Sequence, residues 1–223
     1  PERPVETEPP KPARRESDPA ITIERADEAA EERGDDDLTA ARRALARGRH
    51  ELAERRLDRI LASEPGHDEG RMLLADILLR QGEAARAARI LDQGLEHSRQ
   101  PAQLAARLGR ILIEHDQTAR AIEVLTDHAP PTATDPDYHQ LLAAAHRQAG
   151  DHEAALATFR ALSEVVPGRG AIWVGLGASL EALERHDEAI AAYRRALDAD
   201  DPRAARFADQ RLDALNPDHG ASR

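Results

Sequence analysis

The sequence predicts an all-α fold, a solenoid of about five helical hairpins followed by one further helix. Three observations support this prediction. Small and apolar residues recur with a period of 34 residues, the length of one helix–turn–helix unit. Alanine, leucine, arginine and glutamate, which favour helix, dominate the chain. Only 2% of the residues are aromatic, and the absence of cysteine excludes a disulfide framework and a thiolate zinc site.

Residues 1–34 are expected to form a disordered tether rich in proline and charge. The first 20 residues contain six of the 14 prolines of the chain. A segment of this composition does not bury enough apolar surface to fold. The apolar stretch Ile21–Glu24 is interpreted as a chance cluster or a contact with the folded domain rather than a docking motif. Residues 35–216 are expected to form the solenoid, and residues 217–223 a disordered tail.

Two positions keep the register of the repeats. One position is alanine in all five repeats, and a large apolar residue follows it four positions later. The alanines are Ala53, Ala87, Ala121, Ala155 and Ala189, and the large residues are Leu57, Leu91, Leu125, Phe159 and Tyr193. In the first helix of the last repeat, Gly177 supplies another small residue. Small residues let paired helices approach closely, and a larger side chain at such a contact would overpack it.

The register places each helix in turn. The repeats are expected near residues 34–67, 68–101, 102–135, 136–169 and 170–203. Their first helices are predicted at 36–47, 70–81, 102–115, 137–149 and 170–184, and their second helices at 50–62, 84–98, 118–128, 152–165 and 187–199. Gly48, Gly82 and Gly150 share one phase between paired helices. Prolines after the third repeat predict a shortened second helix and a long connector, with a bend or hinge, at 128–136.

A capping helix is predicted at residues 203–215. Phe207, Leu212 and Leu215 are expected to cover the apolar end of the fifth repeat. The residues expected to face water are Arg206, Asp209, Gln210 and Asp213.

The register resembles the signature of the tetratricopeptide repeat family, W-x2-L-G-x2-Y followed by A-x3-F and P. The fifth repeat reads Trp173-x2-Leu176-Gly177-x2-Leu180 and then Ala189-x3-Tyr193, so that leucine replaces the first tyrosine. Because Trp173 begins a repeat helix in this register, we interpret it as a packing residue rather than a ligand contact.

The sequence contains no recognisable catalytic motif. His139, His146 and His152 come near one another, but no carboxylate stands at the spacing of a helical zinc site. A nucleophile elbow and a glycine-rich phosphate loop are also missing from the sequence. The net charge of -11 argues against a nucleic-acid partner. We expect a non-enzymatic protein with no cofactor, no metal and no small-molecule substrate.

The family resemblance implies a protein-binding groove on the concave face, lined by the first helices. The apolar residues that it places there are Leu38, Leu45, Met72, Leu79, Ala106 and Ile113, and the cations are Arg42, Arg80, Arg110 and Arg147. Such a groove accepts an apolar or helical segment and its carboxylates. The alternative is that these apolar residues pack on neighbouring first helices. The Lys/Asn carboxylate clamp of chaperone-binding members is not present, which argues against that partner class.

Four segments resemble a narrower family. They read QLAARLGRILIE, DYHQLLAAAHRQAGDHEAALATFRAL, IWVGLGASLEALERHDEAIAAYRRAL and FADQRLDAL. They are similar to the tetratricopeptide region of the MshN family, which takes part in biogenesis of the mannose-sensitive haemagglutinin (MSHA) type IV pilus. The likeness covers residues 35–215 and is most specific in the W-x-GLG-x-x-LE-x-L run that begins at Trp173. Ile172 departs from the family, which often has a second tryptophan there.

The resemblance implies a scaffold for pilus assembly whose partners are inner-membrane pilus components. It also implies a periplasmic repeat domain, attached to the bacterial inner membrane by an anchor that this chain does not contain. The beginning of the chain within the proline-rich segment is expected of a portion that follows such an anchor. One alternative is a cytoplasmic adaptor that binds a peptide or partner helix in its groove. Another is a substrate-recruiting module that follows a catalytic domain.

Overall fold

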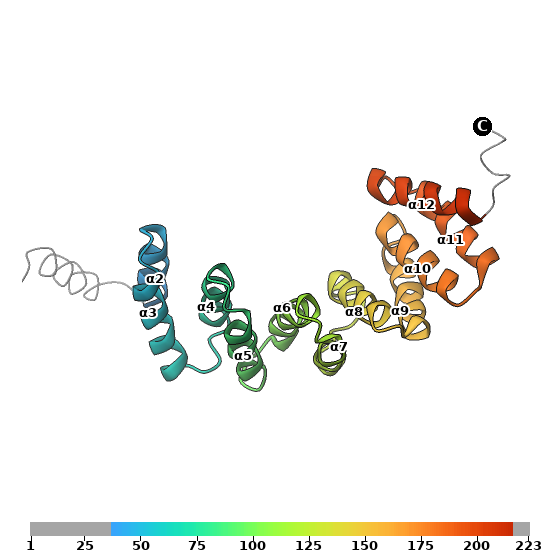
Figure 1. Cartoon of the computed structure of the whole chain (residues 1–223). Helices are drawn as coiled ribbons and strands as arrows, with labels where there is room; N and C mark the ends of the chain where they lie inside the picture. Colours follow the sequence, from blue (N-terminus) through green and yellow to red (C-terminus); the bar gives the residue numbers. More distant parts are fainter. Residues whose placement is uncertain (1–36, 216–223) are drawn as a thin grey trace, which may run out of the picture. The chain divides into compact units, whose positions relative to one another are not determined.

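The computed structural model describes residues 37–215, and these residues form helices joined by turns (Figure 1). The predicted all-α repeat fold is confirmed, while the predicted tether and tail lie outside the described residues. The first helices of the five hairpins are α2 (Asp37–Ala46), α4 (Asp68–Arg80), α6 (Pro101–Glu114), α8 (Pro136–Gln148) and α10 (Gly170–Ala182). The second helices are α3 (His50–Ser63), α5 (Ala84–Leu95), α7 (Thr118–Asp127), α9 (His152–Val165) and α11 (His186–Leu197), and α12 (Pro202–Leu215) follows.

Residue contacts divide the chain into two units, and the division falls within α3, after Arg56. In the described part of the first unit, the alanines of α2 and Ala53 of α3 are buried. Arg56 is only 1% exposed, and its Nη1 lies 3.8 Å from Oδ1 of Asp37. The second unit begins at Leu57 and contains the remaining hairpins and α12. The candidate site lies entirely within this second unit.

The turn inside each hairpin has a residue with positive φ, and these residues recur every 34 positions. The angles are 74° at Gly48, 80° at Gly82, 59° at Asp116, 82° at Gly150 and 59° at Glu184. Glycine adopts this region freely, whereas other residues adopt it at a cost. The glycine phase seen in the sequence therefore reflects a backbone conformation that every repeat shares, including the two repeats that lack glycine.

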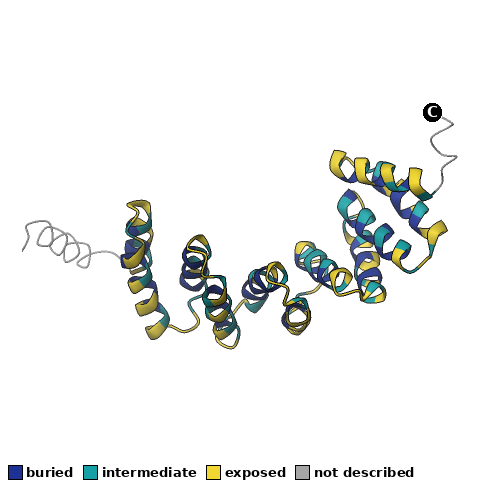
Figure 2. Cartoon of the chain, in the orientation of Figure 1, coloured by how far each residue is buried: buried dark blue, intermediate teal, exposed yellow. Residues whose placement is uncertain are grey.

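The predicted close packing inside the hairpins is present. All five register alanines are fully buried, and the large residues that follow them are at most 3% exposed. A Cβ atom at Gly177 would lie 2.7 Å from Cε1 of Tyr193, and one at Gly109 would lie 2.9 Å from Cγ of Leu125. Glycine therefore lets the large side chain of the second helix lie against the backbone of the first. Figure 2 shows the buried residues on the facing sides of paired helices.

The connector after the third repeat is long, as predicted. Helix α7 has 10 residues, whereas the corresponding helices α5 and α9 have 12 and 14. One hydrogen bond lies within the connector, and another joins the helices that flank it. The backbone N–H of Thr134 donates to the carbonyl of Pro131 at 2.8 Å, and the hydroxyl of Tyr138 donates to the carbonyl of Leu125 at 2.7 Å.

A side-chain N–H bonds a preceding proline carbonyl at the start of three first helices. The bonds join Trp173 Nε1 to Pro167 O at 2.7 Å, Arg71 Nη2 to Pro65 O at 2.6 Å, and His139 Nε2 to Pro130 O at 2.6 Å. The three side chains occupy the same position of the 34-residue register. They share no residue type but all offer an N–H donor. Trp173 also packs against the core around α10, in agreement with its predicted role.

Helix α12 covers the end of the fifth repeat with Ala204, Ala208 and Leu212, which are buried. The prediction was wrong for Phe207, which is 43% exposed. The buried residues are four apart and share one face, whereas Phe207 is turned by about 100° from Ala208. Asp209, expected in water, is half-buried, while Arg206, Gln210 and Asp213 are exposed as predicted.

Glu181 of α10 joins the cap to the hairpin beneath it. Its carboxylate accepts a hydrogen bond from the hydroxyl of Tyr193 at 3.0 Å and one from Nε of Arg211 at 3.1 Å. The Arg211 Nη2 group also donates to the same carboxylate. Helices α10, α11 and α12 are thereby linked through one side chain.

Candidate functional site

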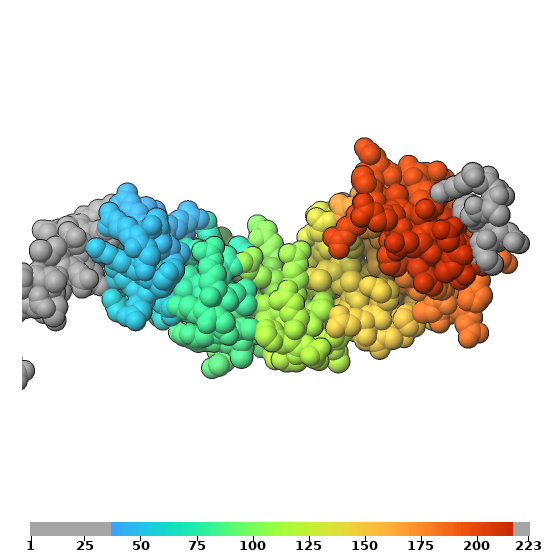
Figure 3. All heavy atoms as spheres, turned by 45° about the horizontal axis from the view of Figure 1, so that its top comes forward, coloured from blue at the N-terminus to red at the C-terminus, as the bar shows by residue number. Residues whose placement is uncertain are grey.

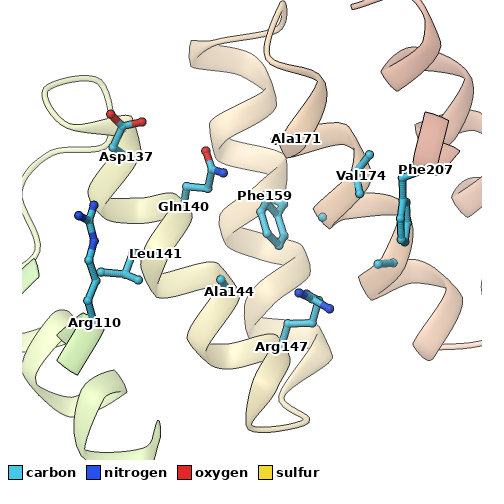
Figure 4. Close-up of a pocket in the computed structure, with 12 residues that line it drawn as sticks. Arg110, Asp137, Gln140, Leu141, Ala144, Arg147, Phe159, Ala171, Val174 and Phe207 are labelled. Carbon is cyan, nitrogen blue, oxygen red and sulfur yellow. The ribbon is translucent and has the colours of Figure 1, made fainter. Parts of the chain in front are cut away.

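A pocket of about 520 Å³ opens between α8, α10 and α12 (Figure 4). Its apolar lining consists of Leu141, Ala144, Phe159, Ala171, Val174, Gly175, Ala178 and Phe207. Its polar lining consists of Arg110, Asp137, Gln140 and Arg147. Figure 3 shows the surface hollowed between the yellow-green residues of α6 and α8 and the red residues of α12. Concave, mostly apolar sites with a few polar groups are typical of ligand and peptide binding.

Gly175 allows Phe159 of α9 to form part of the pocket floor. A Cβ atom at Gly175 would lie 2.3 Å from Cζ of the Phe159 ring, so any side chain there would displace the ring. The ring is only 3% exposed and reaches the pocket from the second helix of the fourth repeat. Earlier repeats carry Leu141, Arg107 and Leu73 at the corresponding position. The floor is therefore a local feature of the last two repeats.

Phe207 of α12 forms the opposite wall. Its ring centroid lies 6.3 Å from that of Tyr193, at an interplanar angle of 56°. Figure 4 places its ring beside Val174 of α10. A large apolar side chain that remains 43% exposed at a pocket mouth gains further burial when a partner covers it.

Two cations at the pocket are without a partner in the described residues. The exposed guanidinium groups of Arg110 and Arg147 make no ion pair or hydrogen bond within residues 37–215. The one carboxylate that lines the pocket, that of Asp137, is paired with Arg169. The polar edge of the pocket is therefore cationic.

The structure brings only two of the ten predicted groove residues to this pocket, namely Arg110 and Arg147. Four other apolar candidates of the second unit are half-buried outside it: Met72, Leu79, Ala106 and Ile113. Arg80 is exposed at the end of α4. The remaining candidates lie on α2 in the first unit, where Leu38 and Leu45 are half-buried and Arg42 is exposed.

Ten of the twelve lining residues were not predicted from the sequence, and Phe159, Gly175 and Phe207 are the ones that give the pocket its shape. Phe159 was assigned to packing within its own hairpin, and Phe207 to the buried face of the cap. The available signal was the glycine at position 175, which stands where all four earlier repeats have larger side chains.

The histidines noted in the sequence do not converge on a metal site. His139 bonds the carbonyl of Pro130, and Nδ1 of His146 lies 3.4 Å from Oδ2 of Asp151. Within residues 37–215, no three histidine, aspartate or glutamate side chains are grouped to hold a metal ion. None of the helices in that range combines the length and the apolar character needed to cross a membrane.

Family models described as tetratricopeptide repeat match residues 44–106, 78–145 and 141–205. The chain belongs to the tetratricopeptide repeat family. Tetratricopeptide repeats typically form non-enzymatic scaffolds that bind other proteins or peptides. The repeat fold of the present chain is suited to protein–protein interaction.

Solved structures of tetratricopeptide repeat proteins show the same fold. A MamA protein is 20% identical, with a TM-score of 0.62, over 73% of this chain and 88% of that chain. YrrB, whose structure is described as having an unusual peptide-binding site, is 18% identical, with a TM-score of 0.65, over 84% and 97%. PilF of Pseudomonas aeruginosa is 16% identical, with a TM-score of 0.61, over 82% and 84%. No curated protein matches the chain in sequence.

Proposed function

We propose that the protein captures a segment of a partner protein in the pocket between α8, α10 and α12. The main support for this proposal is that the pocket has an apolar floor and, at its edge, two guanidinium groups that have no partner in the described residues. Phe207 adds an exposed aromatic wall, and aromatic and arginine side chains are the residues that most often dominate binding energy at protein interfaces.

The same proposal assigns the protein to type IV pilus assembly of the MSHA kind, as an accessory scaffold. Its support is the resemblance to the MshN family in the run that begins at Trp173. That run contains Val174, Gly175 and Ala178, which line the pocket, so the resemblance is strongest where the site is formed. PilF, a pilus-named protein, has the same fold. The partners are then inner-membrane pilus components, and the repeat domain is periplasmic and membrane-anchored.

A capture experiment from a membrane extract of the native cells tests both levels of the proposal. Val174→Glu places a carboxylate on the apolar floor, and Ala157→Glu places the same charge on an exposed position of α9. We expect wild type and Ala157→Glu to capture the same proteins and Val174→Glu to lose them. An unchanged set with Val174→Glu would refute the pocket. A pocket-dependent set without pilus components would refute the pilus assignment and favour a general adaptor.

A further inference from the structure

We infer that the segment bound in the pocket is acidic and carries one large apolar side chain between its carboxylates. This inference rests on the proposed function, because it names the chemistry of the partner at the same site.

The charge of the partner follows from the cations of the second unit. The chain has a net charge of -11, yet Arg110 and Arg147 have no carboxylate partner in residues 37–215. Two other arginines near the first helices are already paired, Arg107 with Asp76 and Arg169 with Asp137. Guanidinium groups bind carboxylates through charge-assisted hydrogen bonds in a fixed fork geometry. Among the arginines that line the pocket, both Arg110 and Arg147 are therefore available to a carboxylate of the partner.

The apolar side chain follows from the shape of the floor. Phe159 and Val174 lie behind the opening and Phe207 lies beside it (Figure 4). A volume of about 520 Å³ accommodates one aromatic or large aliphatic side chain together with adjoining backbone. Burial of such a side chain also covers the exposed part of the Phe207 ring, so both partners lose apolar surface to water.

The positions of the two cations determine the order of acidic and apolar residues along the bound segment. Arg110 comes from α6, and Arg147 comes from the last turn of α8. In Figure 4 their guanidinium groups lie on opposite sides of Ala144. An apolar side chain that lies against the Phe159 ring therefore has one cation on each side, and a segment with carboxylates both before and after its apolar residue reaches both.

Synthetic peptides test this recognition directly with the whole 223-residue chain. The probe is a fluorescein-labelled peptide of sequence EEALFAEE, compared with QQALFAQQ and EEALAAEE by fluorescence anisotropy. We expect the acidic probe to bind at least about tenfold more tightly than the amide probe, with a preference that falls as NaCl is raised. Loss of the phenylalanine should weaken binding by about 30-fold, as expected for an interface hot spot.

Two double variants separate the pocket cations from the general charge of the chain. Arg110→Gln with Arg147→Gln should abolish the preference for the acidic probe. Arg194→Gln with Arg195→Gln removes the same charge from exposed positions of α11 and should leave the preference unchanged. Circular dichroism checks that both remain folded.

The outcomes distinguish this inference from the proposed function. Equal binding of the acidic and amide probes, or a preference that survives loss of Arg110 and Arg147, overturns the inference. Capture that still depends on Val174 would then leave the proposed function standing. Sedimentation that shows a dimer dissolved by Val174→Glu would make a second copy of the chain the occupant, and would also overturn the inference.

Discussion

Replacing Gly177 by alanine is expected to lower the free energy of unfolding, although alanine favours helix more than glycine does. The new Cβ atom would lie 2.7 Å from Cε1 and 2.9 Å from Cδ1 of Tyr193. The ring is fully buried, and its hydroxyl is held by Glu181 at 3.0 Å, so it has little freedom to move. Overpacking costs about 1–3 kcal/mol. Helix propensity returns about 1 kcal/mol, which leaves a net loss of about 1 kcal/mol.

A second substitution tests the cause of this loss. Tyr193→Leu shortens the side chain that opposes position 177. Alanine and leucine already form this pair at Ala75 and Leu91, and both residues are fully buried there. Leu125 nevertheless lies against glycine at Gly109, so with leucine at 193 we expect Gly177→Ala to cost less than it does against the tyrosine ring, without requiring a net gain. The two substitutions should therefore show a coupling of about 1 kcal/mol.

Urea unfolding, monitored by tryptophan fluorescence, measures the change in the free energy of unfolding of the helices around position 177. Trp173 is the sole tryptophan and lies in α10, the helix that contains Gly177. A local probe is needed because repeats of a solenoid are able to unfold separately. An alanine that stabilises the natural chain, or that has the same effect with and without the tyrosine ring, would refute the steric reasoning.

Three further predictions concern the turns, the cap and the tyrosines. Glu184→Gly should raise the free energy of unfolding by about 0.5–1 kcal/mol, because φ is 59° there; urea unfolding with no gain would contradict it. Removal of residues 202–223 should lower the melting temperature by several degrees through exposure of the fifth repeat, and an unchanged melting curve would show that this repeat needs no cap. Burial raises the pKa of both tyrosines, with added effects of Asp135 on Tyr138 and Glu181 on Tyr193, so absorbance at 295 nm should show no phenol ionisation near pH 10 before unfolding. The folded chain then keeps protons that the unfolded chain loses, so stability falls as pH rises above about 10.

The helices were predictable from sequence because the repeat imposes two constraints at once. Each first helix must present a small residue where its partner has a large one, as at Gly177 and Tyr193, and each turn must accept positive φ. These constraints recur every 34 residues, so a helix limit that is ambiguous in one repeat can be placed from the same position of the other repeats. The predicted helix limits consequently lie within a few residues of the observed ones.

The pocket was less predictable because it depends on differences between repeats. Phe159 reaches the floor only because the next repeat has Gly175, and a consensus pattern does not contain that pairing. Phe207 was placed in the core on the basis of size, whereas the spacing of Ala204, Ala208 and Leu212 determines the buried face of α12. The four-residue spacing, rather than side-chain size, was the better guide to that face.

The hydrogen bonds from Trp173, Arg71 and His139 to proline carbonyls affect which repeats separate from their neighbours by local unfolding. Each one braces the first helix of its repeat to the linker that precedes it. Ala105 occupies the same position of the third repeat and has no side-chain N–H, so the linker between α5 and α6 lacks this brace. Amide hydrogen exchange should therefore be fastest there among the linkers of residues 57–215. In a chain whose repeats touch mainly their neighbours, we therefore expect the repeats of residues 57–215 to separate first at that linker, which is held instead by the Ser98 hydroxyl on Asp68 at 2.8 Å.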